Sequence, residues 1–336
     1  MSVGLRVVLF LIGLGLATLI VAHVGPSVVL AQLVTAGWLM LPASIVWGIV
    51  YTFNAAASYT MLGLEPARPG FLRTWVITAA SFGINYITPV AGLGGEGYRA
   101  FALVPWLGRQ RAVGAVVQYR LLHSLAHMVF VLLALIPAAF MLPRTAPAIA
   151  LLLLTALFGI GVGWFLVRRH HEGILEAGLD LLLLIPLIRR LGRRLEHKRP
   201  MLREMDDQIT TLYHEHPGRF WRAFGLEFLS RCVMPFELVV LFWGLGLGIR
   251  IPEAFIAFAL TTTVSNLLFF LPMELGAREG GLYLVFGLLG LGAEHGVFVA
   301  VVTRLRELVW GVMGLMMLWL HGDHVPRQEE LEAGAQ

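Results

Sequence analysis

Apolar side chains occupy this sequence in long blocks that only short polar stretches interrupt. Five blocks are nearly free of charge, and they cover residues 7–22, 38–62, 128–142, 148–167 and 308–320. Most of them belong to segments near the ~20 residues that a helix needs to span a bilayer. The pattern therefore predicts an all-α protein whose chain crosses a membrane several times.

The overall composition agrees with that prediction. The 336 residues are 58% hydrophobic and 14% charged, with a mean hydropathy of +0.78. A soluble domain averages about 45–50% apolar and about 25% charged residues. We expect no nucleic-acid partner and no cofactor. The single cysteine, Cys232, excludes an intrachain disulfide.

One glycine-rich stretch breaks the apolar pattern: PVAGLGGEGYRAF, residues 89–101. Residues 92–97 satisfy G-x-G-x-x-G, the fingerprint of a dinucleotide-binding loop. That loop requires a strand before it and a helix after it within a βαβ unit, which a membrane chain does not offer. We therefore interpret the stretch as a break in a membrane helix that carries a charge into the bilayer.

The uneven distribution of basic residues predicts the topology, because cytoplasmic loops carry an excess of Lys and Arg. Residues 23–37 contain none, whereas residues 168–222 hold eleven of the 25. We expect an inner-membrane protein with a cytoplasmic N-terminus and six spans near residues 5–24, 38–62, 112–141, 147–168, 222–247 and 296–320. Two apolar segments remain, 71–108 and 253–292. Each must enter and leave on the same side, as a re-entrant helical hairpin.

The first apolar run, residues 7–22, raises the alternative of a cleaved signal peptide. The run is long for the apolar core of such a peptide, and the AHVGP sequence after it is a poor cleavage site. A retained first span is therefore favoured.

The two leftover segments belong to an internal repeat. Four pairs of positions share an offset of 183 or 184 residues: Leu62–Leu64 with Leu245–Leu247, Pro89 with Pro272, Glu96 with Glu279, and Arg120 with Arg304. We interpret residues 38–141 and 222–320 as two copies. The second copy begins on the opposite side of the membrane, so the repeats are inverted. Inverted repeats with paired Gly/Pro-interrupted segments indicate a transporter with a site near the bilayer midplane.

The predicted organisation has five parts. They are residues 1–37, a first span and external loop; 38–141, repeat 1 with the hairpin 71–108; 142–221, a span plus a basic amphipathic cytoplasmic region; 222–320, repeat 2 with the hairpin 253–292; and 321–336, a polar tail. Residues 174–199 mix leucines with a cluster of arginines. We interpret them as a helix in the headgroup layer that faces anionic lipid; a short insertion at 174–188 is the alternative.

Proline removes a backbone donor and glycine relaxes the restriction on φ, so both hairpins are suited to a helix break. Placing Glu96 and Glu279 at these breaks costs about 2.5–3.5 kcal/mol per charge on insertion scales. The expected partners are arginines: Arg99 or Arg120 for Glu96, and Arg278, Arg304 or Arg306 for Glu279. Two breaks that meet near the midplane would form one polar cavity. The structural alternative is a pair of ion pairs that lock the hairpins and bind no ligand.

Other polar residues in the apolar segments also have a structural and a functional interpretation. Glu227 and Arg231, four residues apart on one helix, are expected to pair. Glu237, beside Pro235, is predicted to be a lone acid that lines the cavity. His123 and His127 have a spacing that can bind a metal, but no third ligand is evident, so a hydrogen-bonding pair is favoured. The residues expected to cap freed backbone groups are Asn85, Thr88, Ser265 and Asn266.

At these residues the chain resembles the flippase-like membrane domain of the lysylphosphatidylglycerol synthase family. The resemblance is carried by TPVAGLGGEGYRAFAL (88–103), LPMELGAREGGLYLVFGLLGLG (271–292) and TRLRELVWGVMGLMMLW (303–319). It covers most of residues 1–320, and the pattern looks most like the hopanoid-associated subgroup. Members of the family are implicated in moving lipids or lipid-linked molecules between leaflets.

The resemblance implies roles for Pro89, Glu96 and Arg99 in the first hairpin, and for Pro272, Gly276 and Glu279 in the second. Glu274 departs from the family pattern, which has a small residue there, often glycine; an additional acid could change what the cavity accepts. No soluble acyltransferase-like domain follows residue 320, so lysyl transfer from an aminoacyl-tRNA is not expected.

The sequence therefore predicts translocation or leaflet exchange of an amphipathic lipid (a phospholipid, a hopanoid or a lipid-linked glycan), with no enzymatic activity. The predicted substrate-binding residues are Glu96, Arg99, Arg120, Glu237, Glu274, Arg278, Glu279 and Arg304. The predicted hairpin breaks involve Asn85, Pro89, Gly94, Gly95, Pro272 and Gly276. The expected partners are membrane lipids, whose anionic headgroups would contact residues 168–222. A homo-oligomer or a complex with a lipid-synthesis protein is also compatible with the sequence. Two alternatives stay open: a membrane enzyme that uses a glutamate as general base, and a lipid-binding scaffold.

Overall fold

The computed structural model describes residues 37–64, 67–87, 93–169, 174–184, 215–268 and 276–321. It also describes residues 271 and 274 and isolated positions between 26 and 34 and between 193 and 206. The predicted first span, Pro89, Pro272 and most of the basic region 168–222 lie outside these ranges. The described part contains helices and no strand, which confirms the all-α prediction.

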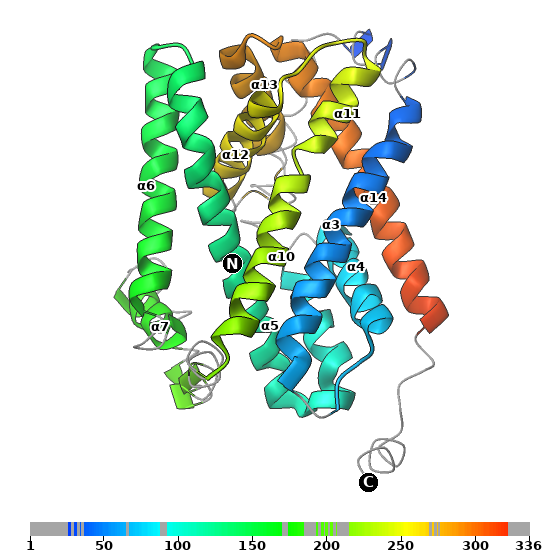
Figure 1. The fold of residues 1–336 in the computed structure, drawn as a ribbon, viewed down its shortest axis with the longest axis vertical. Helices are drawn as coiled ribbons and strands as arrows, with labels where there is room; N and C mark the ends of the chain where they lie inside the picture. Colours follow the sequence, from blue (N-terminus) through cyan, green and yellow to red (C-terminus); the bar gives the residue numbers. More distant parts are fainter. Residues whose placement is uncertain are drawn as a thin grey trace.

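The helices form one elongated bundle (Figure 1). In chain order they are η1 (Gly37–Leu39), α3 (Met40–Met61), η2 (Leu62–Leu64), α4 (Phe71–Ile87), α5 (Leu93–Met141), α6 (Ala146–Arg169), α7 (Ile174–Leu184), α10 (Pro217–Val233), α11 (Phe236–Gly244), α12 (Ile251–Leu267), α13 (Ala277–Leu289) and α14 (Ala293–His321).

Three helical stretches in the described ranges are long and apolar enough to cross a membrane: Met40–Met61, Gly94–Met141 and Ala146–Phe165. They include the predicted spans 38–62, 112–141 and 147–168 to within a few residues.

The predicted span 222–247 is not one helix. Met234 and Pro235 separate α10 from α11, because proline has no N–H with which to continue the helical ladder. The predicted span 296–320 lies within α14, which carries Arg304, Arg306 and Glu307 among its apolar residues.

The segments predicted as hairpins each contain two packed helices. In the first, α4 packs against α5, whose helical geometry is interrupted at Gly108 (φ 72°, ψ 163°). That residue is where the sequence placed the end of the segment 71–108. In the second, α12 packs against α13, which ends at Gly290 in the left-handed conformation that favours glycine. Figure 1 shows α4 in the lower half of the bundle and α12 and α13 in the upper half.

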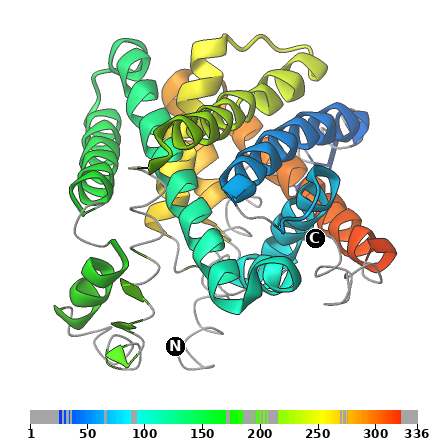
Figure 2. The ribbon, with the colours of Figure 1, turned by 60° about the horizontal axis from the view of Figure 1, so that its bottom comes forward.

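Each hairpin also packs against the long helix of the other repeat, α4 against α14 and α12 against α5. Glycine permits the close approach of α4 and α14. A Cβ atom at Gly83 would lie 3.0 Å from the carbonyl oxygen of Trp310, and one at Gly314 would lie 3.1 Å from Cα of Ala80. Phe130 of α5 meets Phe258 of α12, with ring centroids 6.0 Å apart. The two predicted repeats are therefore interlocked, and the turned view in Figure 2 shows α4 beside α14.

Candidate functional site

A cavity of about 280 Å³ with many polar and charged lining residues lies between helices of the two predicted repeats. Its lining comes from α3, α4, α5, α10, α11, α12, α13 and α14 and from the segment between α12 and α13. The charged lining residues are Arg120, Arg231, Glu237, Glu274, Arg278, Arg306 and Glu307, and the uncharged polar ones include Asn54, Asn85, His123, Thr261, Thr262, Ser265, Asn266 and Thr303. The cavity therefore concentrates charge inside an otherwise apolar bundle.

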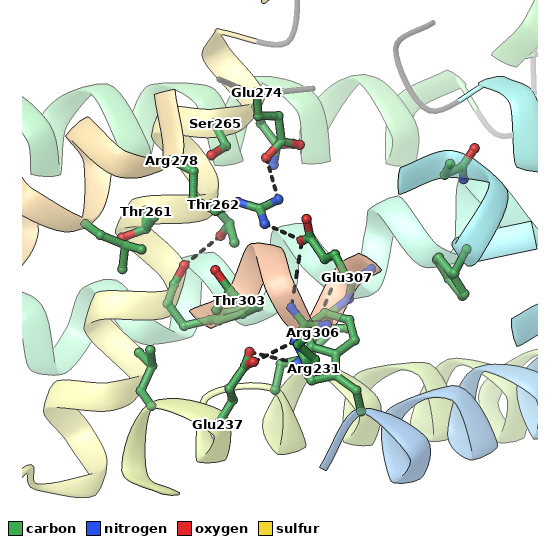
Figure 3. A pocket seen from close by; sticks show the side chains of 18 of the residues that line it. Arg231, Glu237, Thr261, Thr262, Ser265, Glu274, Arg278, Thr303, Arg306 and Glu307 are labelled. Atoms are coloured by element: carbon green, nitrogen blue, oxygen red, sulfur yellow. Dashed lines mark hydrogen bonds and ion pairs between the residues drawn. The ribbon is translucent and has the colours of Figure 1, made fainter. Parts of the chain in front are cut away.

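Arg278 is the central cation of one wall. Its Nη2 lies 2.9 Å from Oε2 of Glu274, and its Nη1 contacts Oε1 of Glu307, so one guanidinium joins two carboxylates (Figure 3). α13 presents Arg278 and α14 presents Glu307. Such forked guanidinium–carboxylate contacts are stronger than neutral hydrogen bonds.

Glu274 is held in an unusual backbone conformation. Its φ is +54°, and it is the single non-glycine residue with positive φ in the described chain. An L-residue with a side chain is disfavoured there by crowding between Cβ and the following carbonyl. Its side chain is nevertheless 40% exposed, the most exposed carboxylate of the lining. The chain thus maintains local strain where it presents a carboxylate to the cavity.

Arg306 and Glu237 form a buried pair at the opposite end of the network. Nε of Arg306 lies 2.6 Å from Oε1 of Glu237, and the indole N–H of Trp47 donates to Oε2 of the same carboxylate at 2.8 Å. Cζ of Arg306 lies 3.9 Å from the centroid of the Trp47 ring. Glu237 stands in the first turn of α11, where the helix dipole favours a negative charge. The prediction of Glu237 as a lone acid is wrong, although it does line the cavity.

Glu279 and Arg304 stand behind this wall and do not line the cavity. Oε1 of Glu279 lies 3.3 Å from Nε of Arg304, and Oε2 accepts a hydrogen bond of 2.8 Å from the backbone N–H of Gly276. This second contact caps α13, because the backbone N–H groups at a helix start lack partners within the helix. Arg304 is thus the main partner of Glu279 among the three arginines that the sequence proposed.

On the other side of the cavity, a buried cluster surrounds Glu227. The carboxylate lies 2.5 Å from Nδ1 of His123 and 3.7 Å from Nη2 of Arg231, and it accepts hydrogen bonds from Asn54 at 2.9 Å and Tyr119 at 3.1 Å. His123 also contacts Arg231 through Nε2. The predicted Glu227–Arg231 pair is confirmed. The closer partner, His123, comes from α5 and was not predicted.

His123 and His127 make hydrogen bonds to different partners. Nε2 of His127 lies 3.1 Å from the amide nitrogen of Asn266 on α12, whereas His123 faces Glu227. Within the described residues, no group of three His, Cys, Asp or Glu side chains is arranged to hold a metal ion.

Glu96, the predicted acid of the first repeat, also pairs with an arginine. Oε1 of Glu96 lies 3.3 Å from Nη1 of Arg120, so Arg120 rather than Arg99 is its partner. Asn85 accepts a hydrogen bond of 2.7 Å from the backbone N–H of Gly95, which confirms its predicted capping role. Arg99 is buried with its Cζ 4.3 Å from the ring of Tyr119, and its Nε and Nη1 find no hydrogen-bond partner in the described part of the chain.

The cavity contains part of the predicted set. Asn85, Arg120, Glu237, Glu274 and Arg278 line it, whereas the lining does not include Gly94, Gly95, Glu96, Arg99, Gly276, Glu279 or Arg304. The sequence analysis missed Trp47, Asn54 and Glu307. Glu307 had a local signal, because it follows Arg304 and Arg306 in a helix that is otherwise apolar. Trp47 and Asn54 had none, since their partners are more than 170 residues away.

Apolar helices of spanning length around a cavity lined by charged residues define a polytopic all-α membrane protein. A family model described as "Lysylphosphatidylglycerol synthase TM region" matches residues 3–314, so the chain belongs to that family. No match was found among curated proteins or among solved structures.

Proposed function

We propose that this protein moves an amphipathic lipid between the leaflets of the bacterial inner membrane. The observation that carries the proposal is the cavity itself, in which Arg278 joins Glu274 and Glu307 inside a bundle of apolar helices. Ionisable side chains at membrane depth are rare, face a water-filled cavity or the bundle interior, and mark substrate pathways. Candidate lipids are phospholipids, hopanoids and lipid-linked glycans.

The two helix pairs supply the route. In the proposal, α4 with the first part of α5 enters from the cytoplasmic face as a re-entrant hairpin, and α12 with α13 enters from the other. Support comes from their positions toward opposite ends of the bundle, from the interruption of α5 at Gly108 and from the end of α13 at the left-handed Gly290. Irregular backbone at membrane depth is tolerated where it lines a wet cavity. Alternating movement of the two repeats around a fixed site then exposes the cavity to each leaflet in turn.

In this mechanism the headgroup enters the cavity while the acyl or hopanoid tail stays in the bilayer. Hydroxyl or amine groups of the head meet Glu274, which is the most exposed acid of the lining. An anionic group meets Arg120, whose side chain is 51% exposed and bound through a single nitrogen to Glu96. No covalent step is assigned to the chain, and the basic region 168–222 is proposed to contact anionic headgroups.

The test is a leaflet assay with fluorescent lipids in vesicles that contain the purified full chain. We expect dithionite quenching of inner-leaflet label to be at least about tenfold faster than in empty vesicles, a barrier difference of roughly 1.4 kcal/mol. The variant Arg278→Gln/Glu307→Gln removes the guanidinium that joins Glu274 and Glu307, together with one of these two carboxylates, and should return the rate to the empty-vesicle level.

A matched control changes the same residue types outside the cavity. Arg250 and Glu253 pair at 2.5 Å at the start of α12 and do not line the cavity, so Arg250→Gln/Glu253→Gln should retain exchange. Absence of acceleration with every lipid class would refute the proposal. Chemical change of a lipid in detergent, with no bilayer present, would instead support the enzyme alternative. Unchanged exchange in the cavity variant would show that lipid moves elsewhere.

A further inference from the structure

A second polar site lies at the other end of α3, around the glycine of the LGL motif. Gly63 is the middle residue of η2, and a Cβ atom there would lie 2.8 Å from Nη1 of Arg68 and 3.2 Å from Cζ of Arg219. The two guanidinium groups therefore converge on one point, although Arg68 follows α3 and Arg219 belongs to the first turn of α10. Only the absence of a side chain at residue 63 allows both guanidinium groups to approach the backbone there.

These two cations have no acidic partner in the part of the chain that the structure describes. Nη1 of Arg219 is buried without a hydrogen-bond partner. Nη1 of Arg68 makes one long contact, 3.5 Å, with the carbonyl oxygen of Tyr59. Two guanidinium groups that approach each other repel unless an anion lies between them. The arrangement is therefore incomplete as it stands, and it is complementary to an oxyanion.

The surroundings resemble the headgroup layer of a membrane. Cζ of Arg68 lies 4.2 Å from the centroid of the Tyr59 ring, and Phe71 meets the same ring edge-on at 5.7 Å. Trp221 stands two residues after Arg219 and is 62% exposed. Aromatic side chains of this kind gather at membrane–water interfaces. Such surroundings are typical of the depth at which phospholipid phosphates lie.

The second copy of the motif has a different physical basis. Gly246, in Leu245–Leu247, has φ +71°, and no atom lies near the position that a Cβ would take. Glycine is therefore required there by the left-handed backbone conformation, and not by the close approach of a neighbouring group. The arginine near it, Arg250, is paired with Glu253 at 2.5 Å. The open pair of arginines therefore belongs to the first copy alone and is not a by-product of the repeat.

We infer that Arg68 and Arg219, which converge beside Gly63, together bind the phosphate of an anionic phospholipid. Guanidinium groups present planar donor pairs that match phosphate oxygens, which an ammonium group cannot do. This site is separate from the cavity, shares no lining residue with it, and does not depend on lipid exchange.

The test measures lipid-induced stabilisation of the purified full chain. Thermal unfolding would be followed in micelles containing phosphatidylglycerol or phosphatidylcholine, and separately with inorganic phosphate. We expect phosphatidylglycerol to raise the midpoint of the wild type above its value in phosphatidylcholine, with an affinity at least about tenfold higher than that of Arg68→Gln/Arg219→Gln. Arg144→Gln, an exposed arginine in the connection between α5 and α6, should retain the full effect.

Two further variants keep the inference testable if the double glutamine variant does not fold. Gly63→Ala places a methyl group where the two guanidinium groups now approach the backbone. It meets only the ends of flexible side chains, so the variant should fold, but the displaced arginines should lose the phosphatidylglycerol effect. Arg68→Lys/Arg219→Lys retains the charge and should weaken the effect, because lysine lacks the planar fork. Equal stabilisation of the wild type and Gly63→Ala would overturn the inference. So would stabilisation by inorganic phosphate equal to that by phosphatidylglycerol, since the ligand would then not be a lipid.

Discussion

The two predicted hairpins, α4 with the first part of α5 and α12 with α13, have different residues at equivalent positions, and the charged side chains that these hairpins contribute to the cavity lining come from the second. Arg278 stands 183 residues after Gly95, which is the offset between Glu96 and Glu279. In the first hairpin, Gly95 allows α5 to pack directly on α4, because a Cβ there would lie 1.9 Å from the carbonyl oxygen of Ser81. In the second, the long side chain of Arg278 extends to Glu274 and Glu307. The first hairpin is closed by backbone contact, whereas the second is lined by charge.

Glu96 and Glu279, the acids at equivalent positions, also differ in how exposed they and their arginine partners are. Glu96 is 16% exposed and its partner Arg120 is 51% exposed, whereas Glu279 is 7% and Arg304 20% exposed. Both pairs have the same separation of 3.3 Å. An exposed ion pair contributes little to stability, while a buried one is costly to break. The repeat therefore preserves the residue pair but not its energetic role.

The largest effect is expected at a position where only the second repeat is charged. Arg306 corresponds, at the offset of 184, to the buried residue Leu122. Arg306→Met leaves Glu237 buried without its cation and should lower the free energy of unfolding by about 3–5 kcal/mol. Leu122→Met is volume-conserving and should change it by less than about 1.5 kcal/mol. Denaturant titration in detergent measures both, and similar losses in the two variants would contradict the asymmetry.

The next effect concerns the closed hairpin. Gly95→Ala forces α4 and α5 apart and should lower the free energy of unfolding by about 3 kcal/mol, at the upper end of overpacking effects. The matched variant Gly97→Ala, two residues later, meets no atom within 4 Å. It should be neutral or stabilise the helix by up to about 1 kcal/mol, since alanine is the better helix former. If Gly95→Ala left the midpoint of thermal unfolding unchanged, α4 and α5 would not be packed through their backbones at this position.

A direct comparison of the paired acids should give an intermediate effect. Glu279→Gln weakens both the contact with Arg304 and the cap at Gly276, with an expected loss of about 1.5–3 kcal/mol. Glu96→Gln should change stability by about 1 kcal/mol or less, as exposed pairs do. The two variants share chemistry and differ in surroundings, so equal losses in denaturant titration would show that burial does not distinguish the repeats.

The smallest stability effect is expected at Glu274. Glu274→Gly removes the left-handed strain, worth roughly 1–2 kcal/mol, and also removes a half-exposed ion pair with Arg278. The net change in the free energy of unfolding should be a gain of no more than about 1 kcal/mol. Lipid exchange should nevertheless fall, because the exposed carboxylate is lost. Glu274→Asn, whose residue type tolerates this conformation, should show the same fall; full exchange in both variants would remove Glu274 from the site.

Sequence reasoning succeeded where the signal was local or repeated. The long apolar helices followed from hydropathy, and the observed partners of Glu96 and Glu279, Arg120 and Arg304, were among the arginines that the sequence proposed. It failed for Glu237, because its partners Arg306 and Trp47 are distant in sequence and carry no periodic mark. It also failed at Pro235, where an apolar run of spanning length concealed a helix boundary. The pairing of Glu237 and the helix boundary at Pro235 both depend on contacts in three dimensions, which a hydropathy pattern does not contain.

The interlocked packing of α4 on α14 and of α12 on α5 has a consequence for biosynthesis. As the chain emerges from the ribosome, α4 must wait for more than 200 further residues before its partner α14 exists. The amino-terminal half made alone will therefore expose the face of small residues formed by Ala79, Ala80 and Gly83 to lipid or to chaperones. The two halves, produced as separate polypeptides in one cell, should assemble with each other, because each completes the other's tertiary structure.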